Sequence, residues 1–196
     1  MLKKSMLLLG SVLALCAFVL PSVASAASWS PVGTTDGRID SGNLGFSIAG
    51  PSGSSCTASS FTGVVHTASV ATITGASFAN CHSNLGAGVG CTTTATGTNF
   101  PWRLTPTDTT RIEIHGVDID VYFETTPGNP GGCAQTGLNL RLTGTLIASF
   151  TPGPPRVFDF NGASGLSAHI GPPSNVTLAM STRGQATTTG LLNVLM

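Results

Sequence analysis

Charged side chains are scarce in this sequence. Eight Lys and Arg residues balance eight Asp and Glu residues over 196 positions, so 8% of the chain is charged and the net charge is zero. An average soluble domain has about 25% charged residues. A nucleic-acid binder held by a basic surface is therefore excluded, and so is a charged disordered chain. No stretch beyond residue 26 has the 3.6-residue apolar period of a helix, which argues against a helical bundle.

Hydroxyl side chains and turn formers take the place of the missing charge. The chain has 21 Ser, 27 Thr, 25 Gly and 12 Pro residues. Thr is enriched in strands, whereas Gly and Pro interrupt them. This composition favours a neutral β-protein with faces rich in Ser and Thr.

The N-terminal segment has the layout of a secretory signal peptide. Lys3 and Lys4 precede an apolar run over 6–20, and Ala24-Ser25-Ala26 matches a cleavage site of small residues. The run is short for a membrane span, which needs about 20 residues. An uncleaved anchor and a lipoprotein signal are the alternatives. We expect removal of residues 1–26, which leaves 27–196 as a single secreted β-domain with no lysine and six Arg against eight acids.

The cysteine count supports export. Of five cysteines, Cys16 lies in the predicted signal segment, and four remain: Cys56, Cys81, Cys91 and Cys133. An even number of cysteines in an exported chain, without a CxxC pair, indicates two disulfides. A zinc site is the alternative, with His82 as the nearby imidazole. Three disulfide pairings are possible.

Residues 56–81 favour one of these pairings. The segment resembles two strands around a polar Ala68-Ser69 turn. In a hairpin centred on that turn, Cys56 lies opposite Cys81 and Val64 lies opposite Ile73. Opposed side chains on one face are about 5 Å apart, within reach of a disulfide. We therefore expect Cys56–Cys81, which leaves Cys91–Cys133, although Ala-Ser is not a preferred hairpin turn and the register could slip.

Apolar alternation predicts strands along the rest of the chain. In 111–124 the apolar positions are even up to Ile114 and odd from Val117, so a β-bulge at His115-Gly116 would restore one apolar face. Further strands are expected at 44–48, 91–96, 100–104, 138–150, 157–160, 176–180 and 191–196. About eight to ten strands at this spacing predict an all-β fold: a single antiparallel β-sandwich or barrel.

Acidic residues gather on the bulged strand. Asp108, Glu113, Asp118, Asp120 and Glu124 lie within 17 positions. One interpretation is a Ca²⁺ site or a general acid/base pair built on Asp118-x-Asp120, since alternate residues on a strand are about 7 Å apart. The other is a solvated face with Arg111 and Arg141 as partners. The second interpretation is favoured, and no metal or cofactor site is assigned.

No catalytic residue is assigned either. His66, His82, His115 and His169 each lack a motif partner, and the GxSxG nucleophile motif is absent. Trp102 lies in an apolar segment and is expected in the core; an exposed Trp102 or Trp29 would instead favour carbohydrate binding. We therefore expect a protein that is not an enzyme.

Several segments resemble a group of small exported bacterial β-proteins and, more distantly, the family of alkane-oxidation activator proteins. The resemblance covers about residues 54–150 and rests on the cysteine spacing and on four segments: SSCTASSFTG, ITGASFANC, FPWRLTP with Pro101-Trp102, and RIEIHGVDI. It implies a location at the cell surface or in a biofilm matrix and a role without catalysis. It carries over no catalytic residue.

The expected function is that of a secreted structural or adhesive protein of the cell surface or extracellular matrix. The alternatives are an extracellular module that binds a glycan or an apolar compound and, less favoured, a secreted hydrolase. The expected partners are matrix components or further copies of the chain, joined by β-augmentation through Leu191–Met196. That strand could instead close the fold of its own chain. No nucleic-acid partner and no stable membrane span in 27–196 are expected.

Overall fold

The computed structural model describes residues 28–30, 37–48, 53–83, 91–108, 110–128, 133, 135–151, 157–170, 176–189 and 193–195. Within these ranges every regular element is a strand, and no helix is long and apolar enough to span a membrane. The strands are β1 (Ser28–Ser30), β2 (Gly37–Ile48), β3 (Gly53–Thr67), β4 (Val70–Ser83), β5 (Cys91–Gly97), β6 (Trp102–Pro106), β7 (Arg111–Thr125), β8 (Asn139–Thr151), β9 (Val157–Asp159), β10 (Gly162–Ile170), β11 (Val176–Thr189) and β12 (Asn193–Leu195). The predicted signal segment lies outside the described residues.

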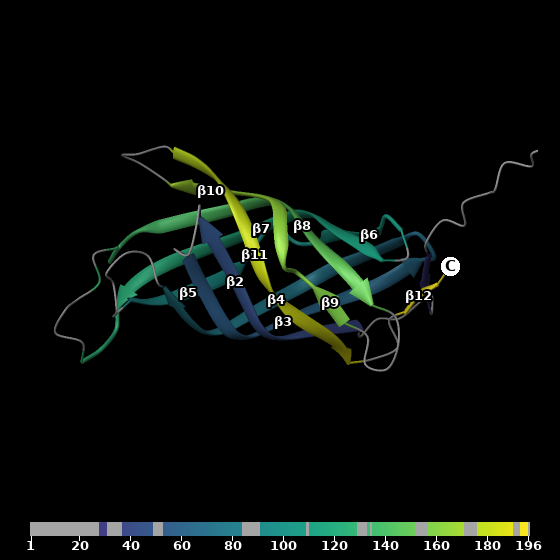
Figure 1. The fold of residues 1–196 in the computed structure, drawn as a ribbon, viewed down its shortest axis with the longest axis horizontal. Helices are drawn as coiled ribbons and strands as arrows, with labels where there is room; N and C mark the ends of the chain where they lie inside the picture. Colours follow the sequence, from purple (N-terminus) through teal and green to yellow (C-terminus); the bar gives the residue numbers. More distant parts are fainter. Residues whose placement is uncertain are drawn as a thin grey trace, which may run out of the picture.

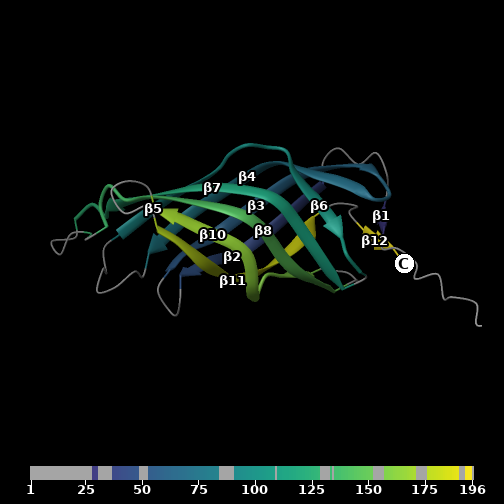
Figure 2. The same ribbon diagram turned by 90° about the horizontal axis from the view of Figure 1, so that it is seen from above.

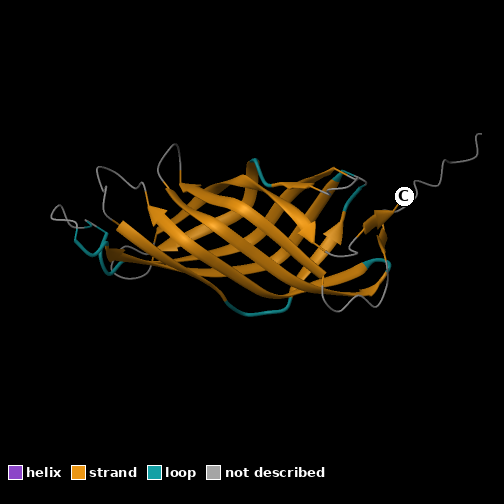
Figure 3. Ribbon diagram, turned by 90° about the horizontal axis from the view of Figure 1, so that it is seen from below, coloured by secondary structure: helices purple, strands orange, loops and turns teal. Residues whose placement is uncertain are grey.

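The sheet closes on itself. Going round it, β2 pairs with β3, then β4, β5, β7, β8, β10 and β11, and β11 pairs again with β2; every pairing is antiparallel. Figure 1 shows β11 beside β2, and Figure 3 shows the strands of one side crossing those of the other. The all-β antiparallel fold is thus confirmed, in its closed form. The described strands number twelve, more than the eight to ten expected.

Two positions in this closed sheet are each shared by two short strands, so its eight positions hold ten strands, and the separate pair β1 and β12 brings the number to twelve. β5 and β6 follow one another between β4 and β7. β9 and β10 do the same between β8 and β11. The first break holds Pro101, which cannot donate a ladder hydrogen bond. The second break falls at Phe160-Asn161.

The predicted bulge on β7 is confirmed. His115 pairs with Thr145 and Val117 pairs with Gly144, so Gly116 is the extra residue, and its φ is +73°. A positive φ costs glycine little because glycine has no Cβ. The bulge brings the apolar residues on both sides of it to the interior: Ile112, Ile114, Val117, Ile119, Val121 and Phe123 are all buried.

The hairpin prediction is correct at its cysteines and wrong nearer the turn. Cys56 lies opposite Cys81, and the two form a disulfide. Val64, however, lies opposite Thr72 and not Ile73. One extra residue on β4 and one on β3 shift the register by one and then restore it. The second disulfide joins Cys91 to Cys133.

The interior of the closed sheet is filled with side chains. Phe61 of β3 lies at its centre, with ring centroids 6.4 Å from Trp102 and 6.3 Å from Phe160. These two partners come from the two interrupted positions of the sheet. Trp102 is fully buried and donates its indole N–H to the Thr98 carbonyl at 2.9 Å. Trp29 is buried too, so neither tryptophan forms an exposed platform.

The C-terminal strand pairs within its own chain. β12 runs antiparallel to β1, with Ser28 opposite Leu195 and Ser30 opposite Asn193. The two strands form a small separate sheet at one end of the long axis (Figures 1 and 2). The backbone of this strand is thus engaged with β1, as in the alternative that it closes its own fold. Leu191, Leu192 and Met196 lie outside the described residues.

The two disulfides are expected to supply much of the stability of the fold. They close loops of 25 and 42 residues, which the chain-entropy relation values at about 3.5 and about 4 kcal/mol. The Cys56→Ser/Cys81→Ser and Cys91→Ser/Cys133→Ser variants should lose about these amounts in the free energy of unfolding. Urea denaturation followed by tryptophan fluorescence measures this loss. An unfolding free energy within about 1 kcal/mol of that of the parent would contradict the expectation.

Candidate functional site

The outer face of the sheet carries a continuous line of polar side chains. Ser60 lies opposite Ser77, Ser77 opposite Thr96, Thr96 opposite Asp120, and Asp120 opposite Arg141. We call these five residues the polar row. They cross β3, β4, β5, β7 and β8, and four interstrand spacings give the row a length of about 19 Å. All five are exposed or half-buried, so the row is a surface available for contact.

An exposed aromatic ring lies beside the polar row. Tyr122 follows Asp120 by two positions on β7, on the same outer face, and is the large apolar side chain that is exposed among the described residues (41%). Its cross-strand neighbours are Thr94 on β5 and Asn139 on β8. A tyrosine ring among hydroxyl and amide groups offers one apolar face and several hydrogen-bonding groups, the combination found in surfaces that bind sugars.

Asp118 is a buried acid held by an ion pair with the half-exposed Arg141. Its carboxylate accepts hydrogen bonds from Arg141 Nε at 2.8 Å and Arg141 Nη2 at 2.6 Å. Asn99 Nδ2, from the segment between β5 and β6, donates a third at 2.6 Å. The Asp118 backbone carbonyl accepts from the Thr98 N–H at 2.8 Å. Asp118 therefore fastens the break between β5 and β6 to β7 and, through Arg141, to β8.

These contacts keep the carboxyl group ionised. The hydrogen bonds from Arg141, opposed by burial and helped by Asn99, lower the pKa of Asp118 to about 2. The same pairing raises the pKa of Arg141. The Asp118 oxygens already bind two side chains, so the geometry favours the ion-pair interpretation of this acid over the Ca²⁺ interpretation. Among the described residues, no group of three His, Cys, Asp or Glu side chains could hold a metal ion.

A second charged group lies at the other side of the bulge. Glu113 accepts from Arg111 at 2.9 Å and lies 3.3 Å from His115 Nε2. His115 Nδ1 is 3.2 Å from Thr145 Oγ1, directly opposite on β8. The order acid–imidazole–hydroxyl is that of a hydrolytic triad, but here it runs along the outer face of a sheet. We interpret it as two pairs along β7 and one cross-strand pair to β8, beside the bulge.

The other predicted polar residues are dispersed. His66 contacts Thr72 at 2.9 Å near the β3–β4 turn. His82 lies on β4, and His169 lies on β10 opposite Arg141. Asp108 is exposed, and its hydrogen bonds with Thr110 lower its pKa. Glu124 is exposed near the far end of β7. The five clustered acids thus divide among separate places in the fold.

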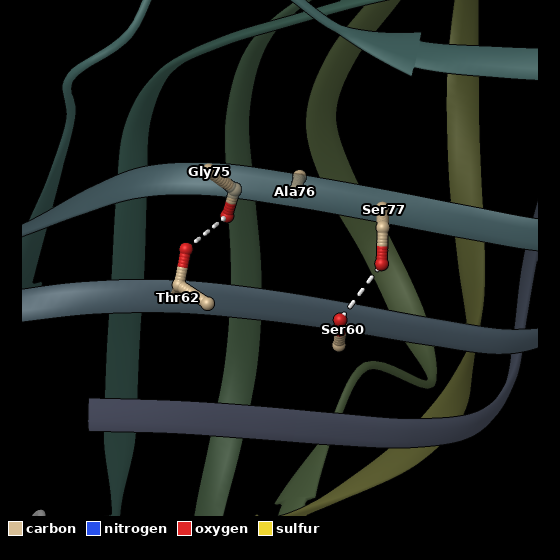
Figure 4. A pocket seen from close by; sticks show the side chains of 5 residues that line it. All are labelled: Ser60, Thr62, Gly75, Ala76 and Ser77. Atoms are coloured by element: carbon tan, nitrogen blue, oxygen red, sulfur yellow. Dashed lines mark hydrogen bonds between the residues drawn. The ribbon is translucent and has the colours of Figure 1, made fainter. Parts of the chain in front are cut away.

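A shallow pocket lies at one end of the polar row. It has a volume of about 230 Å³ and is lined by Ser60, Thr62, Gly75, Ala76 and Ser77. Figure 4 shows the lining side chains bonded to one another: Ser60 Oγ to Ser77 Oγ at 2.8 Å, and Thr62 Oγ1 to the Gly75 carbonyl at 3.4 Å. A ligand there would meet hydroxyl groups that already have partners.

Two residues of this surface were missed by sequence reasoning. Asn99 lies in a segment with no regular pattern, although its φ of +53° is a conformation that Asn adopts more readily than most residues. Tyr122 lies on the strand predicted at 111–124, but no role was predicted for its ring. From Val117 onward the apolar residues of β7 are at odd positions. The even number of Tyr122 could therefore have indicated a side chain on the outer face.

The fold and the surface define a class: a closed antiparallel sheet, stapled by two disulfides, with an outer face rich in hydroxyl groups. The family model described as alkane oxidation protein activator PraA/PraB-like matches residues 1–153. The chain belongs to this family, which confirms the resemblance seen in the sequence. No curated protein and no solved structure matches the chain.

The Asp118–Arg141 pair predicts a pH-dependent contribution to stability. Because the folded pKa of Asp118 is about 2, below the ordinary 3.8, the contribution is present above about pH 4 and is lost as the pH falls through 2. Asp118→Asn should lower the free energy of unfolding by about 1–2 kcal/mol at pH 6, since Arg141 is half exposed and its attraction is partly screened. The loss should shrink toward zero at pH 2.

Urea denaturation of the Asn variant and its parent at several pH values measures this difference. Glu124→Gln is the matched control because Glu124 is an exposed acid on the same strand. It should change the unfolding free energy by less than about 0.5 kcal/mol throughout. A constant difference between parent and Asp118→Asn from pH 6 to pH 2 would contradict the assignment.

Proposed function

We propose that this protein is a secreted, non-enzymatic structural or adhesive component of the bacterial cell surface or biofilm matrix. The observation that carries the proposal is the pair of disulfides that staple the closed sheet, Cys56–Cys81 and Cys91–Cys133. Structural disulfides form and persist in oxidising, extracytoplasmic compartments. The predicted signal segment at 1–26 supports the same location.

The outer face supports contact with other surfaces. Its polar row offers three hydroxyl groups beside the opposed charges of Asp120 and Arg141, and the ring of Tyr122 adds an apolar plane. Contacts of this kind depend little on ionic strength because little of their energy is Coulombic. The family description names an activator of alkane oxidation. A surface protein can promote oxidation of a water-insoluble alkane without catalysis, by holding cells at the oil–water boundary.

Adhesion should therefore depend on the polar row. Cells that produce the parent protein should carry it outside the cytoplasm and partition into a hexadecane layer more than cells that lack it. Ser77→Lys/Thr96→Lys places two charges in the middle of the row and should lower partitioning severalfold, because a charge is costly to bring to an apolar surface. Cell fractionation and the hexadecane partition assay measure the two effects.

The matched control is Ala68→Lys/Ser69→Lys. It adds the same two charges at exposed positions of the β3–β4 turn and should leave partitioning unchanged. Protein found only in the cytoplasm would overturn the proposed location. Equal partitioning of both double variants and the parent would remove the polar row from the adhesive surface.

A glycan-binding role is the second candidate, and the exposed Tyr122 with Thr94 and Asn139 beside it favours it. A glycan array should then give binding that Tyr122→Ala abolishes and Tyr122→Phe retains, since stacking requires the ring and not its hydroxyl. Array binding with this pattern, together with unchanged hexadecane partitioning in Ser77→Lys/Thr96→Lys, would favour the glycan role over the adhesive one.

A further inference from the structure

Two strands complete the closed sheet. β11 pairs with β2 from Met180 opposite Ile48 to Thr189 opposite Arg38, and β10 pairs with β8 from Gly165 opposite Thr145 to Ile170 opposite Leu140. β10 and β11 also pair with each other as a hairpin. Without this hairpin, β2 and β8 would each present an unpaired edge, which is a template for another strand.

The hairpin is not fastened by the disulfides. Both disulfides lie between Cys56 and Cys133, so they hold β3, β4, β5 and the segment before β8. The family match also ends at residue 153, before β9. Apart from the small β1–β12 sheet, the described strands therefore form a crosslinked body, β2–β8, and a closing hairpin, β10–β11, joined to the body through β9.

The contact between β8 and β10 is largely one of backbone with backbone. A Cβ on Gly144 would collide with the carbonyl oxygen of Gly165, so the two strands approach more closely there than side chains would allow. Leu166 and Ala168 are the side chains of β10 described as buried, and one of them is a single methyl group. Ile170 packs on the core as well, so the cost of detaching β10 is recovered only when another β10 pairs with the same edge of β8.

Aromatic side chains pack the chain against the body just before the hairpin begins. Phe158 of β9 packs on Phe150, with ring centroids 5.2 Å apart, and Phe160 packs on Phe61 at 6.3 Å. Gly162 follows at once, with φ +141° and open space around its Cβ position. The chain can therefore change direction at Asn161-Gly162 while β9 stays anchored.

From these observations we infer that the β10–β11 hairpin is exchanged between copies of this chain, each copy closing the sheet of its neighbour. A second copy is the partner that fits, because the edges of β2 and β8 match the hairpin residue for residue in the register each chain already uses. When β12 moves with the hairpin and pairs with the β1 of the neighbouring copy, exchange keeps every strand pairing and needs no new interface, which makes it a low-cost route to assembly. Successive exchange in one direction gives open chains of protomers.

This inference rests on the proposed matrix role. It adds to that role the way in which copies of the chain join. It differs from β-augmentation through Leu191–Met196, because the donated segment is β10–β11 and the accepting edges are β2 and β8. Its test below measures strand exchange in purified protein. The location and partition assays above are independent of it, so the failure of one is distinguishable from the failure of the other.

Cysteines placed on opposite sides of the β8–β10 contact test the exchange. Thr143 and Ser167 lie opposite each other on the outer face, both half-buried. Two full-length variants, Thr143→Cys and Ser167→Cys, are exported with the native disulfides formed, carry tags of different mass, and are mixed at high concentration at the foot of the urea transition. After return to buffer and mild oxidation, the expected product is a covalent heterodimer on a non-reducing gel.

A matched pair within the body supplies the control. Ser60 and Ser77 also lie opposite each other, but on β3 and β4, which a disulfide holds together. A mixture of Ser60→Cys and Ser77→Cys should give at least tenfold less heterodimer. Equal yields from the two mixtures, or no heterodimer from the first, would overturn the inference.

A locked variant gives the second measurement. In Thr143→Cys/Ser167→Cys, oxidised as a dilute monomer, the hairpin is tied to its own β8, and self-association measured by light scattering should fall at least tenfold below the parent. Ser47→Cys/Ser181→Cys ties the hairpin to β2 instead and should act in the same way if the first lock impairs folding. Locked protein that assembles as the parent does would show that copies join without exchange.

Discussion

The hydrogen bonding of β10 and β11 to the edges of β8 and β2 is the constraint on which the rest of the fold depends. A closed sheet has no free edge and encloses its core. An open one would leave two long strands unpaired and would expose the apolar interior around Phe61. Every strand of the body is therefore stable in its observed form only while this closing contact is made, although the disulfides keep the body itself connected.

Low charge explains why the fold is stabilised in this way. With 8% charged residues, surface ion pairs can contribute little, and exposed pairs contribute little in any protein. Stability must come from buried side chains, from the two disulfides and from Asp118, the carboxylate that is buried among the residues the structure describes. Asp118 stabilises the break between β5 and β6. Its carboxylate accepts a hydrogen bond from Asn99 and its backbone carbonyl accepts one from Thr98, and both donors belong to that break. A charge-poor surface is then free to carry the hydroxyl groups and the Tyr122 ring that the proposed function uses.

The features that depend on residues near one another in the sequence were predictable from local sequence patterns. The change of apolar phase on either side of His115-Gly116 predicted the bulge, because one face of a strand must stay buried. The distances of Cys56 and Cys81 from the Ala68-Ser69 turn predicted their opposition, because the two register shifts between them cancel. The shifts themselves, seen at Val64, were not predicted. On β4 the inward side chains change from Ile73 to Ala76 and Phe78, a change of phase in a segment with few large apolar residues to mark it. The Asn99–Asp118 bond and the partners that close the sheet depend on contacts distant in sequence, which no local pattern contains.

The two interrupted positions of the sheet differ in the way that the assembly inference requires. At the first, Asp118 binds Asn99 and Arg141, and Phe100 stacks on Trp102 with centroids 4.6 Å apart. Side chains thus hold both β5 and β6 in place. At the second, aromatic packing holds β9, whereas β10 meets β8 through Gly144 and Gly165. Phe61 lies between the two, in contact with Trp102 and Phe160, so the aromatic part of the core ends before Gly162, and Leu166 and Ala168 are the buried side chains that follow it on β10. Because the aromatic packing stops at that residue, the segment after it closes the sheet through strand pairings that a second copy can supply in the same register.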